Sequence, residues 1–465
     1  MPTSQGWPVT GLGTLGFGQF SAALDINVTS TVVGYSAYDL SGDVHAFRWN
    51  QGSGMLDIGT LAAPGTLGFY QSVAFGVNDL GEVVGWSDAY HGFLLNRAFY
   101  WSAATGMVEL PSDTLHMSYA HDITNGSVVI GCGVLPGKVR SQILRWDKSA
   151  VGGWQVTGLG EPAAAGGQAC GLGLNGAGSV VGSYPGPGVL TGFFRKPSGG
   201  YVTLGAGTKA NRVVASRFVG YGGQTLPGGV TDPGAGLPWE WPNLTAGPYS
   251  LGYLYLPGGE ASDLNAGNHI VGTVAGSPSL TYPPYSRAFY WDCAGGMVDL
   301  GSLFDQSFDA ASAAAINAGD IVAGTSNGFA VIWGVTPSAT SVVPLPYQPR
   351  CIDPPTVIFG AGRFLQSGLL SRPGFDATLL DPNTVTVSDG FGHVTPIAHR
   401  LKPPGPPTFQ LRDINGDGVL DMQVQFSTTE MINAGTLTRQ SFQFVVSWID
   451  PTGLPGSGKY PARVR

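Results

Sequence analysis

The chain has 465 residues, of which 11% are charged and 43% hydrophobic, with 73 Gly and 34 Pro. This composition disfavours long exposed helices and disorder, and favours short strands joined by turns around a packed core. A formal net charge of -8, with 22 Lys and Arg that do not cluster, argues against a nucleic-acid partner. No run of about 18 apolar residues predicts a transmembrane segment. The N-terminus lacks the pattern of a signal peptide, so we expect a removed leader or another export route.

A repeated unit occupies most of the chain. It is clearest where AFGVNDLGEVVGWS (74–87) precedes RAFYWSAATGMVEL (97–110), and where SDLNAGNHIVGT (262–273) precedes RAFYWDCAGGMVDLGSL (287–303). The first unit contains ALDINVTSTVVGYS (23–36). One position marks the end of the first strand in six units: Asn27, Asn78, Thr124, Asn175, Asn265 and Asn317. The wide gap before Asn265 fits a degenerate fifth copy, which gives seven units in all.

Each unit predicts four short antiparallel strands. In the second unit, VAFGVN and EVVGWS flank the turn NDLGE, and RAFYW and MVELP form a second pair. The Gly after each Val-Val pair, as at Gly34 and Gly85, predicts a close backbone approach or a bulge. Sheets of this size bury both faces only when they stack around an axis. The sequence therefore predicts an all-β fold, a seven-bladed β-propeller over residues 1–340.

The two ends of the repeat region are complementary. The last unit supplies three strands over residues 312–333 but only the weak SVVPLP (341–346) as a fourth, whereas the chain begins with an unpaired VTGLGTL (9–15). An open ring would leave an exposed edge. We therefore predict that the N-terminal strand closes the last blade.

These motifs resemble the HAF repeat family, named for a motif like His45-Ala46-Phe47. The resemblance covers roughly residues 6–335 and is weakest in the fourth unit, where Lys196 replaces the Trp, and in the fifth. It implies an extracellular or cell-surface repeat protein of bacteria, and it implies no particular activity.

The repeat gives way to a Pro-rich segment, predicted as a linker over 341–355, and then to a strand-rich region, 356–465, predicted as a β-sandwich. That region contains DINGDGVLD (413–421), which resembles the calcium loop of integrin-type β-hairpins. Oxygen ligands at this spacing suit one Ca²⁺ ion. The predicted ligands are Asp413, Asn415, Asp417, the Val419 carbonyl and Asp421. The alternative is an acidic double turn without a metal.

Other candidate sites carry open alternatives. Asp25, Asp122 and Asp263 occupy equivalent positions in predicted innermost strands, where they would bind a cation or act as acid and base in a central channel. The alternative is that each caps its own turn or faces water in the channel. Aromatic segments at 239–255 and 279–291 suggest a contact surface for protein or carbohydrate, or else core packing. Four cysteines permit three disulfide pairings or remain free: Cys132, Cys170, Cys293 and Cys351.

No nucleophile triad or zinc spacing is evident. The sequence therefore favours a non-enzymatic, extracellular or cell-surface structural protein with a calcium-stabilised C-terminal domain. Its expected partners are other copies of itself, other surface proteins or an extracellular polysaccharide. The alternative is a secreted hydrolase or lyase that acts on a polysaccharide at the channel mouth.

Overall fold

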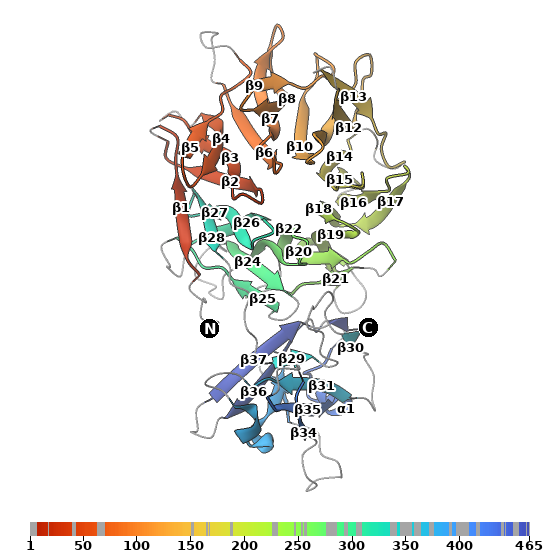
Figure 1. Cartoon of the computed structure of the whole chain (residues 1–465). Helices are drawn as coiled ribbons and strands as arrows, with labels where there is room; N and C mark the ends of the chain where they lie inside the picture. Colours follow the sequence, from red (N-terminus) through yellow and green to blue (C-terminus); the bar gives the residue numbers. More distant parts are fainter. Residues whose placement is uncertain are drawn as a thin grey trace. The chain divides into compact units, whose positions relative to one another are not determined.

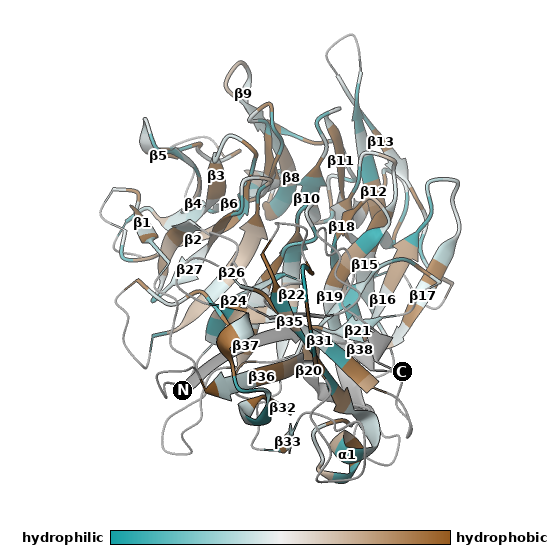
Figure 2. Ribbon diagram, turned by 60° about the horizontal axis from the view of Figure 1, so that its bottom comes forward, coloured by the Kyte–Doolittle hydropathy of each residue, from teal (hydrophilic) through white to brown (hydrophobic). Residues whose placement is uncertain are grey.

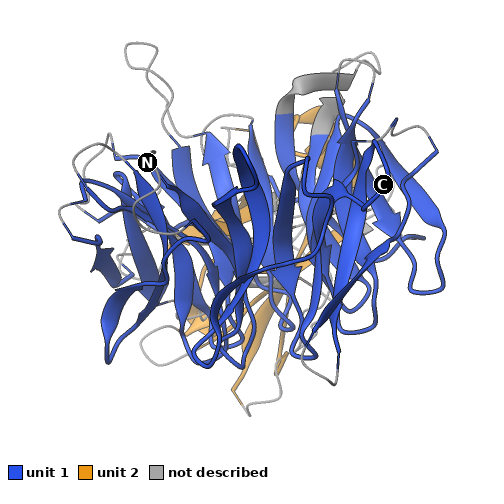
Figure 3. Cartoon of the chain, turned by 90° about the horizontal axis from the view of Figure 1, so that it is seen from above, with its two compact units in different colours: residues 1–290, 298–336 blue, residues 291–297, 337–465 orange. Residues whose placement is uncertain are grey.

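The structure is a computed structural model that divides the chain into two compact units, 1–290 with 298–336, and 291–297 with 337–465 (Figure 3). The described residues are 7–16, 18–39, 43–62, 70–149, 153–163, 166, 168–186, 189–225, 231–245, 248–252, 254, 258–275, 286–292, 296–303, 309–334, 342–344, 356–357, 364–371, 376–389, 393–396, 409–414, 419–438, 441, 443–449, 455–461 and 463–464. Both units are built from antiparallel sheets. Within these ranges no helix is long and apolar enough to cross a membrane.

The first unit consists of consecutive four-stranded antiparallel sheets, numbered here in chain order. Sheets 1 to 3 contain β2 (Ser21–Ile26), β3 (Val32–Ala37), β4 (Val44–Asn50) and β5 (Gly54–Asp57); β6 (Ser72–Val77), β7 (Val83–Tyr90), β8 (Leu94–Ser102) and β9 (Gly106–Glu109); β10 (Ser118–Ile123), β11 (Val128–Val134), β12 (Ser141–Lys148) and β13 (Trp154–Gly158). The strands predicted from the second unit of the repeat are confirmed.

The later sheets follow the same plan. Sheets 4 to 6 contain β14 (Cys170–Leu174), β15 (Val180–Pro185), β16 (Leu190–Arg195) and β17 (Tyr201–Ala206); β18 (Thr208–Val214), β19 (Arg217–Thr225), β20 (Thr231–Trp241) and β21 (Tyr249–Ser250); β22 (Gly259–Leu264), β23 (Ile270–Ala275), β24 (Ser286–Asp292) and β25 (Gly296–Asp299). Figure 1 shows these sheets placed one after another around a centre, with the first strand of each on the inner side.

The seventh sheet joins the two ends of this unit. It contains β26 (Ala311–Ile316), β27 (Ile321–Ser326) and β28 (Phe329–Gly334), and its fourth strand is β1 (Val9–Gly13), which pairs antiparallel with β28. The competing candidate, β29 (Val342–Pro344), pairs instead with β31 of the second unit. Strand β1 therefore supplies the fourth strand of the seventh sheet.

Neighbouring sheets pack large side chains against small ones. Phe47 and Trp49 of sheet 1 share a core with Ala323 and Ala330 of sheet 7, and Phe99 of sheet 2 shares one with residues of sheet 1. Brown, pale and teal segments mix along the strands (Figure 2), and the inner strands are buried on both faces, as in β2 and β6, where five of six residues are buried. The Ala-Phe-x-Trp strand therefore serves the packing between sheets.

The same close backbone contact recurs in several sheets and explains the Gly of the second strand. A Cβ on Gly34 would lie 1.9 Å from the carbonyl oxygen of Ala22, and one on Gly85 would lie 1.9 Å from that of Val73. The first strand approaches this closely because its register shifts by one residue nearby. The predicted close approach and the predicted bulge are both present.

Asparagine side chains connect the sheets at the turns after the first strands. Nδ2 of Asn27 donates to the Asn78 carbonyl at 2.9 Å, and Nδ2 of Asn78 donates to the Thr124 carbonyl at 3.0 Å. Nδ2 of Asn317, in sheet 7, donates to the Asn27 carbonyl at 3.1 Å, which links the last sheet to the first. Where the marker position of the repeat is Asn, its side chain is therefore an inter-sheet hydrogen-bond donor.

The second unit contains two further four-stranded sheets and short helical segments. Its elements are β29, β31 (Phe364–Leu369), β35 (Asp421–Ser427) and β34 (Phe409–Arg412); β33 (Val394–Pro396), β32 (Thr386–Ser388), β36 (Gln443–Ile449) and β37 (Pro455–Pro461); the parallel pair β30 (Thr356–Val357) and β38 (Arg463–Val464); the 3-10 turns η1 (Ala377–Leu379) and η2 (Pro382–Thr384); and α1 (Thr428–Asn433). Val424 and Phe426 of one sheet share a core with Phe444 and Val446 of the other. Strand β29 lies inside the predicted linker, and residues 345–355 lie outside the described residues.

Candidate functional site in the inner strands

A register shift recurs in the first strand of every sheet of the first unit. It follows Ala23, Ala74 and Ala120 in the first three sheets, and one extra residue stands opposite the second strand each time. The residue after this bulge occupies an equivalent place in all seven sheets: Asp25, Gly76, Asp122, Gly173, Arg212, Asp263 and Ala315. Three of these seven positions therefore carry Asp, one carries Arg, and the other three carry Gly or Ala.

Each of the three carboxylates connects its own sheet to the next. Asp25 accepts hydrogen bonds from the Ile26 amide at 2.9 Å and from the Val77 amide of sheet 2 at 2.8 Å. Asp122 and Asp263 accept from their following residues and from the amides of the next sheets in the same way. Gly76, at the equivalent place in sheet 2, allows a close approach to the first strand of sheet 3, because a Cβ on Gly76 would lie 3.0 Å from the His121 carbonyl oxygen.

Arg212 brings two of these carboxylates together. Its Nη1 donates to Asp122 Oδ1 at 2.7 Å, and its Nε lies 3.3 Å from Asp263 Oδ1. The side chains of Asp122 and Asp263 are 3% and 7% exposed, and that of Arg212 is 30% exposed. Two of the three carboxylates therefore meet at a guanidinium, and Asp25 interacts with this group electrostatically without a direct contact to Arg212.

The pKa values of these side chains depend on burial and on the charge of Arg212. Burial raises the pKa of Asp25 to about 7, against the opposing attraction of Arg212. Burial also raises the pKa of Asp263, and Arg212 again opposes the shift. The three neighbouring carboxylates raise the pKa of Arg212 above its usual value despite burial, so this side chain stays charged.

This arrangement favours a structural role for the carboxylates. An acid and base pair needs oxygens that can reach a substrate. Both oxygens of Asp25, Asp122 and Asp263 already accept backbone hydrogen bonds, and one oxygen of Asp122 also binds Arg212. The three carboxylates act as clamps between sheets, which differs from local turn capping because each carboxylate accepts one of its hydrogen bonds from an amide of the next sheet.

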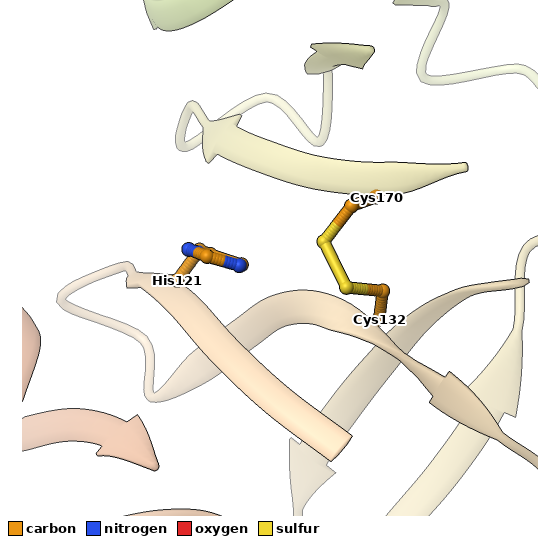
Figure 4. Close-up of side chains that lie close together, drawn as sticks. All are labelled: His121, Cys132 and Cys170. Atoms are coloured by element: carbon orange, nitrogen blue, oxygen red, sulfur yellow. A yellow bond between two sulfur atoms is a disulfide. The ribbon is translucent and has the colours of Figure 1, made fainter. Parts of the chain in front are cut away.

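Aromatic side chains of the first and second strands pack between sheets 2 and 3. Phe75 stacks on His121 with ring centroids 4.9 Å apart, and Trp86 meets Tyr119 edge-on at 6.4 Å. Burial, reinforced by the charge of Lys209, lowers the pKa of His121 to about 4, so the imidazole is neutral at neutral pH. Figure 4 shows His121 next to the Cys132–Cys170 disulfide.

That disulfide resolves one open question from the sequence. Cys132 of β11 and Cys170 of β14 are bonded, which links sheet 3 covalently to sheet 4. Cys293 and Cys351 lie outside the described residues. The sequence left this pairing open because it depends on which strands are neighbours in space.

Exposed apolar side chains gather on the loops at one end of sheets 1 to 3. In a four-stranded meander, the loop between the second and third strands and the loop to the next sheet leave at the same end. These loops carry Tyr38, Tyr90, Phe93, Leu94, Leu115 and Met117, which are 44% to 63% exposed and are called here the apolar rim.

Buried polar contacts hold the rim in place. Arg97, which is fully buried, donates to Glu109 at 2.7 Å and to the carbonyls of Asp113 and His116, which lie in the loop that carries Leu115. His91 lies 2.9 Å from the other oxygen of Glu109. The rim is therefore presented by a fixed loop scaffold.

A second polar cluster was missed by the sequence analysis. Glu82 accepts hydrogen bonds from Ser127 at 2.7 Å, from Tyr100 at 2.6 Å and from Lys148 at 3.1 Å. Burial raises its pKa, but these hydrogen bonds outweigh burial and lower it overall. The cluster joins sheets 2 and 3, and its polar partners are too far apart in sequence to form a recognisable motif.

The aromatic segments contribute to the core where they are described. Trp241 is 3% exposed and stacks on Phe218 with centroids 5.1 Å apart, and Tyr290 and Trp291 are each 1% exposed. Residues 276–285 lie outside the described residues. The described aromatic side chains of 239–255 and 279–291 therefore match the packing alternative.

The predicted calcium loop is described only at its ends. Asp413 and Val419 are exposed, whereas Asp421 is fully buried and accepts hydrogen bonds from the amides of Ser371 and Ile414, each at 2.8 Å. Asn415 and Asp417 lie outside the described residues. The Asp421 carboxylate thus anchors the loop to β35, and the calcium assignment stays a prediction.

Comparisons with known proteins add no assignment. No family model matches the chain, and no curated protein matches it. The resemblance to HAF repeats therefore rests on the sequence motifs alone.

Proposed function

We propose that the first unit is a seven-bladed β-propeller closed by its N-terminal strand. Three observations support this: β1 completes the sheet of β26 to β28, sheets 1 and 7 share a hydrophobic core, and Asn317 donates to the Asn27 carbonyl across the same junction. Each contact at this junction has a counterpart between sheets that follow one another along the chain. A closed ring accounts for this similarity, because the contact between sheets 7 and 1 is then equivalent to the contacts between the other neighbouring sheets.

We further propose that the protein is a non-enzymatic binding or assembly protein that works outside the cytoplasm. The observation that carries this proposal is the use of Asp25, Asp122 and Asp263 as clamps between sheets, since their oxygens accept hydrogen bonds from backbone amides instead of facing a substrate. The Cys132–Cys170 disulfide supports an oxidising compartment.

The apolar rim is the surface we assign to association with other copies of the chain. Exposed apolar side chains on a fixed framework bind with little loss of conformational entropy. Arg97 and Glu109 hold that framework from below. The second unit would be stabilised by calcium at the loop of Asp413 to Asp421.

Light scattering of the purified protein across salt concentrations tests this proposal. We expect assembly that persists at high salt, because apolar contacts are not screened. Replacing Tyr90, Leu94 and Leu115 together by Ser should abolish assembly. Leu80→Ser is the matched control, because Leu80 is 69% exposed but lies in the turn between β6 and β7, at the opposite end of its sheet.

Activity screening on polysaccharides supplies the opposing outcome. A protein that stays monomeric at every salt concentration and cleaves a glycan would overturn the proposal. Loss of that cleavage in Asp122→Asn or Asp263→Asn would establish the hydrolase or lyase alternative instead.

A further inference from the structure

Three potential metal ligands meet where sheet 3 contacts sheet 4. A ring nitrogen of His121 and the sulfur atoms of Cys132 and Cys170 all lie within 4.8 Å of one another. The three residues come from β10, β11 and β14. Figure 4 shows one nitrogen of the imidazole on the side of the disulfide.

The geometry of His121 suits a ligand. It is the extra residue of the bulge between Ala120 and Asp122, and both of these neighbours are held in the inner strand. Phe75 stacks flat on the ring at an interplanar angle of 17°, which fixes the ring plane and leaves the nitrogens at its edge. The bulge and the stacking together direct the imidazole without help from the sulfur atoms.

The ligand set has a defined chemical preference. Two thiolates and one neutral imidazole form a Cys₂His set, which binds Zn²⁺ with a fourth position open to water. Soft thiolate ligands also exclude Mg²⁺ and Ca²⁺ in favour of Zn²⁺. The two thiolate charges neutralise the cation, and the nearby ammonium of Lys209 is itself paired with Glu260 at 2.7 Å.

We propose that reduction of the Cys132–Cys170 disulfide converts this junction into a zinc site formed by Cys132, Cys170 and His121. An external dithiol supplies two electrons that break the S–S bond and passes its two protons to the two cysteines as it becomes a disulfide. A phosphine supplies the two electrons instead, and one water molecule then supplies the oxygen of the phosphine oxide and the two protons that complete the thiols. Zinc binding then releases both thiol protons to solvent and forms two Zn–S bonds and one Zn–N bond. All three residues are partly exposed, so reductant and metal both have access.

The two states perform the same mechanical task. The disulfide links sheets 3 and 4 in an oxidising compartment, and the zinc ion links the same strands in a reducing one. Such a site would hold the junction together before the chain reaches an oxidising environment. This inference is independent of the assembly proposed above.

Titration with Co²⁺ as a spectroscopic substitute for Zn²⁺ tests the site in the full-length protein. After phosphine reduction, we expect the ligand-field bands of tetrahedral Co²⁺ and a thiolate-to-cobalt charge-transfer band, both removed by one equivalent of Zn²⁺. The unreduced protein should show neither band. The variant Cys132→Ser/Cys170→Ser keeps every other potential ligand and serves as the background.

A variant of His121 distinguishes a zinc site with three protein ligands from zinc binding by the two thiolates alone. Loss of a residue that merely orients a metal ligand costs about 10–100-fold in affinity, so His121→Ala should weaken Zn²⁺ binding by at least roughly tenfold. His116→Ala is the matched control, because its side chain is 41% exposed and lies in a loop outside the cluster. It should bind Zn²⁺ as the native protein does.

Three results would overturn the proposal. One is a reduced native protein that gives no thiolate-to-cobalt band above the double-serine background. Another is equal zinc affinity in His121→Ala and the native protein. If reduction lowers the melting temperature, zinc should restore it in the native protein but not in His121→Ala, and a failure to restore it would also contradict the site.

Discussion

Replacing Arg212 by Met tests the carboxylate clamps most specifically. The substitution keeps an unbranched side chain of similar length but removes the guanidinium that binds Asp122 and lies 3.3 Å from Asp263. Both carboxylates are more than nine-tenths buried, so their charges would lose the only cation that contacts them among the described residues.

The expected cost follows from that burial. Breaking a buried ion pair from one side costs about 3–5 kcal/mol, and the 30% exposure of Arg212 reduces this to about 2–4 kcal/mol near pH 8. For a unit of about 330 residues, unfolding entropy near 0.7 kcal/mol per degree converts this cost to a decrease of roughly 3–6 °C in Tm.

The cost should depend on pH in a defined direction. The pKa of Asp263 is raised in the folded protein, and removal of Arg212 raises it further, so stability is lost as pH rises through that folded pKa. The difference in Tm between the native protein and Arg212→Met should therefore shrink as the pH is lowered from 8 towards 5, because protonation of the Asp263 carboxyl removes the unpaired charge.

Differential scanning calorimetry at several pH values provides the measurement. Arg145→Met is the matched control, because Arg145 pairs with Asp147 at 2.6 Å but both side chains are more than a third exposed. A surface pair contributes at most about 1 kcal/mol. Equal Tm losses in Arg212→Met and Arg145→Met, or a loss that does not vary with pH, would refute the reasoning.

Two further predictions concern Asp25 and the predicted calcium loop. Burial raises the folded pKa of Asp25 to about 7, so the stabilisation from this group is complete below its unfolded pKa and is lost as pH rises through about 7. The native protein should therefore gain unfolding free energy on the order of 2 kcal/mol between pH 8 and pH 5. Denaturant titrations should show that Asp25→Asn removes this gain. Chelation of calcium should lower the Tm of the second unit alone, and Asp417→Ala should reproduce that loss, since saturating calcium contributes about 2.7 kcal/mol at 100 times its Kd; identical melting curves with and without calcium would remove the assignment.

The strands could be predicted because each unit of the repeat contains its own turn and its own alternating pattern. The segment VAFGVNDLGEVVGWS matches β6 and β7, and the glycine at Gly85 marks a contact that only a residue without Cβ allows. Strand β1 was also predicted from its local pattern. Its place in the last blade was predicted because no strand nearby in the sequence is left to pair with it.

The site was harder to predict because its partners come from different sheets. The positions of Asp122 and Asp263 were found through the repeat, but Arg212 was missed because the fifth unit has lost most of its motif. Alignment of ANRVVASRFVG (210–220) with the first unit would have placed Arg212 at the position of Asp25. The disulfide and the Glu82 cluster had no such signal, since each depends on the spatial order of strands.

Closure by the N-terminal strand is the central claim, and it can be tested by truncation. Removal of residues 1–15 deletes β1 with Leu12 and Leu15, each 6% exposed, and frees the edge of β28. Two buried leucines alone account for about 4–6 kcal/mol, or roughly 6–9 °C in Tm for this unit.

The measurement is the Tm of the first unit in the chain that lacks residues 1–15, compared with the intact chain and with a control that lacks only residues 1–6 and keeps every β1 pairing. The account predicts a decrease of at least about 5 °C for the longer deletion and almost none for the shorter one. A longer deletion that melts within about a degree of the intact chain would contradict closure by the N-terminal strand.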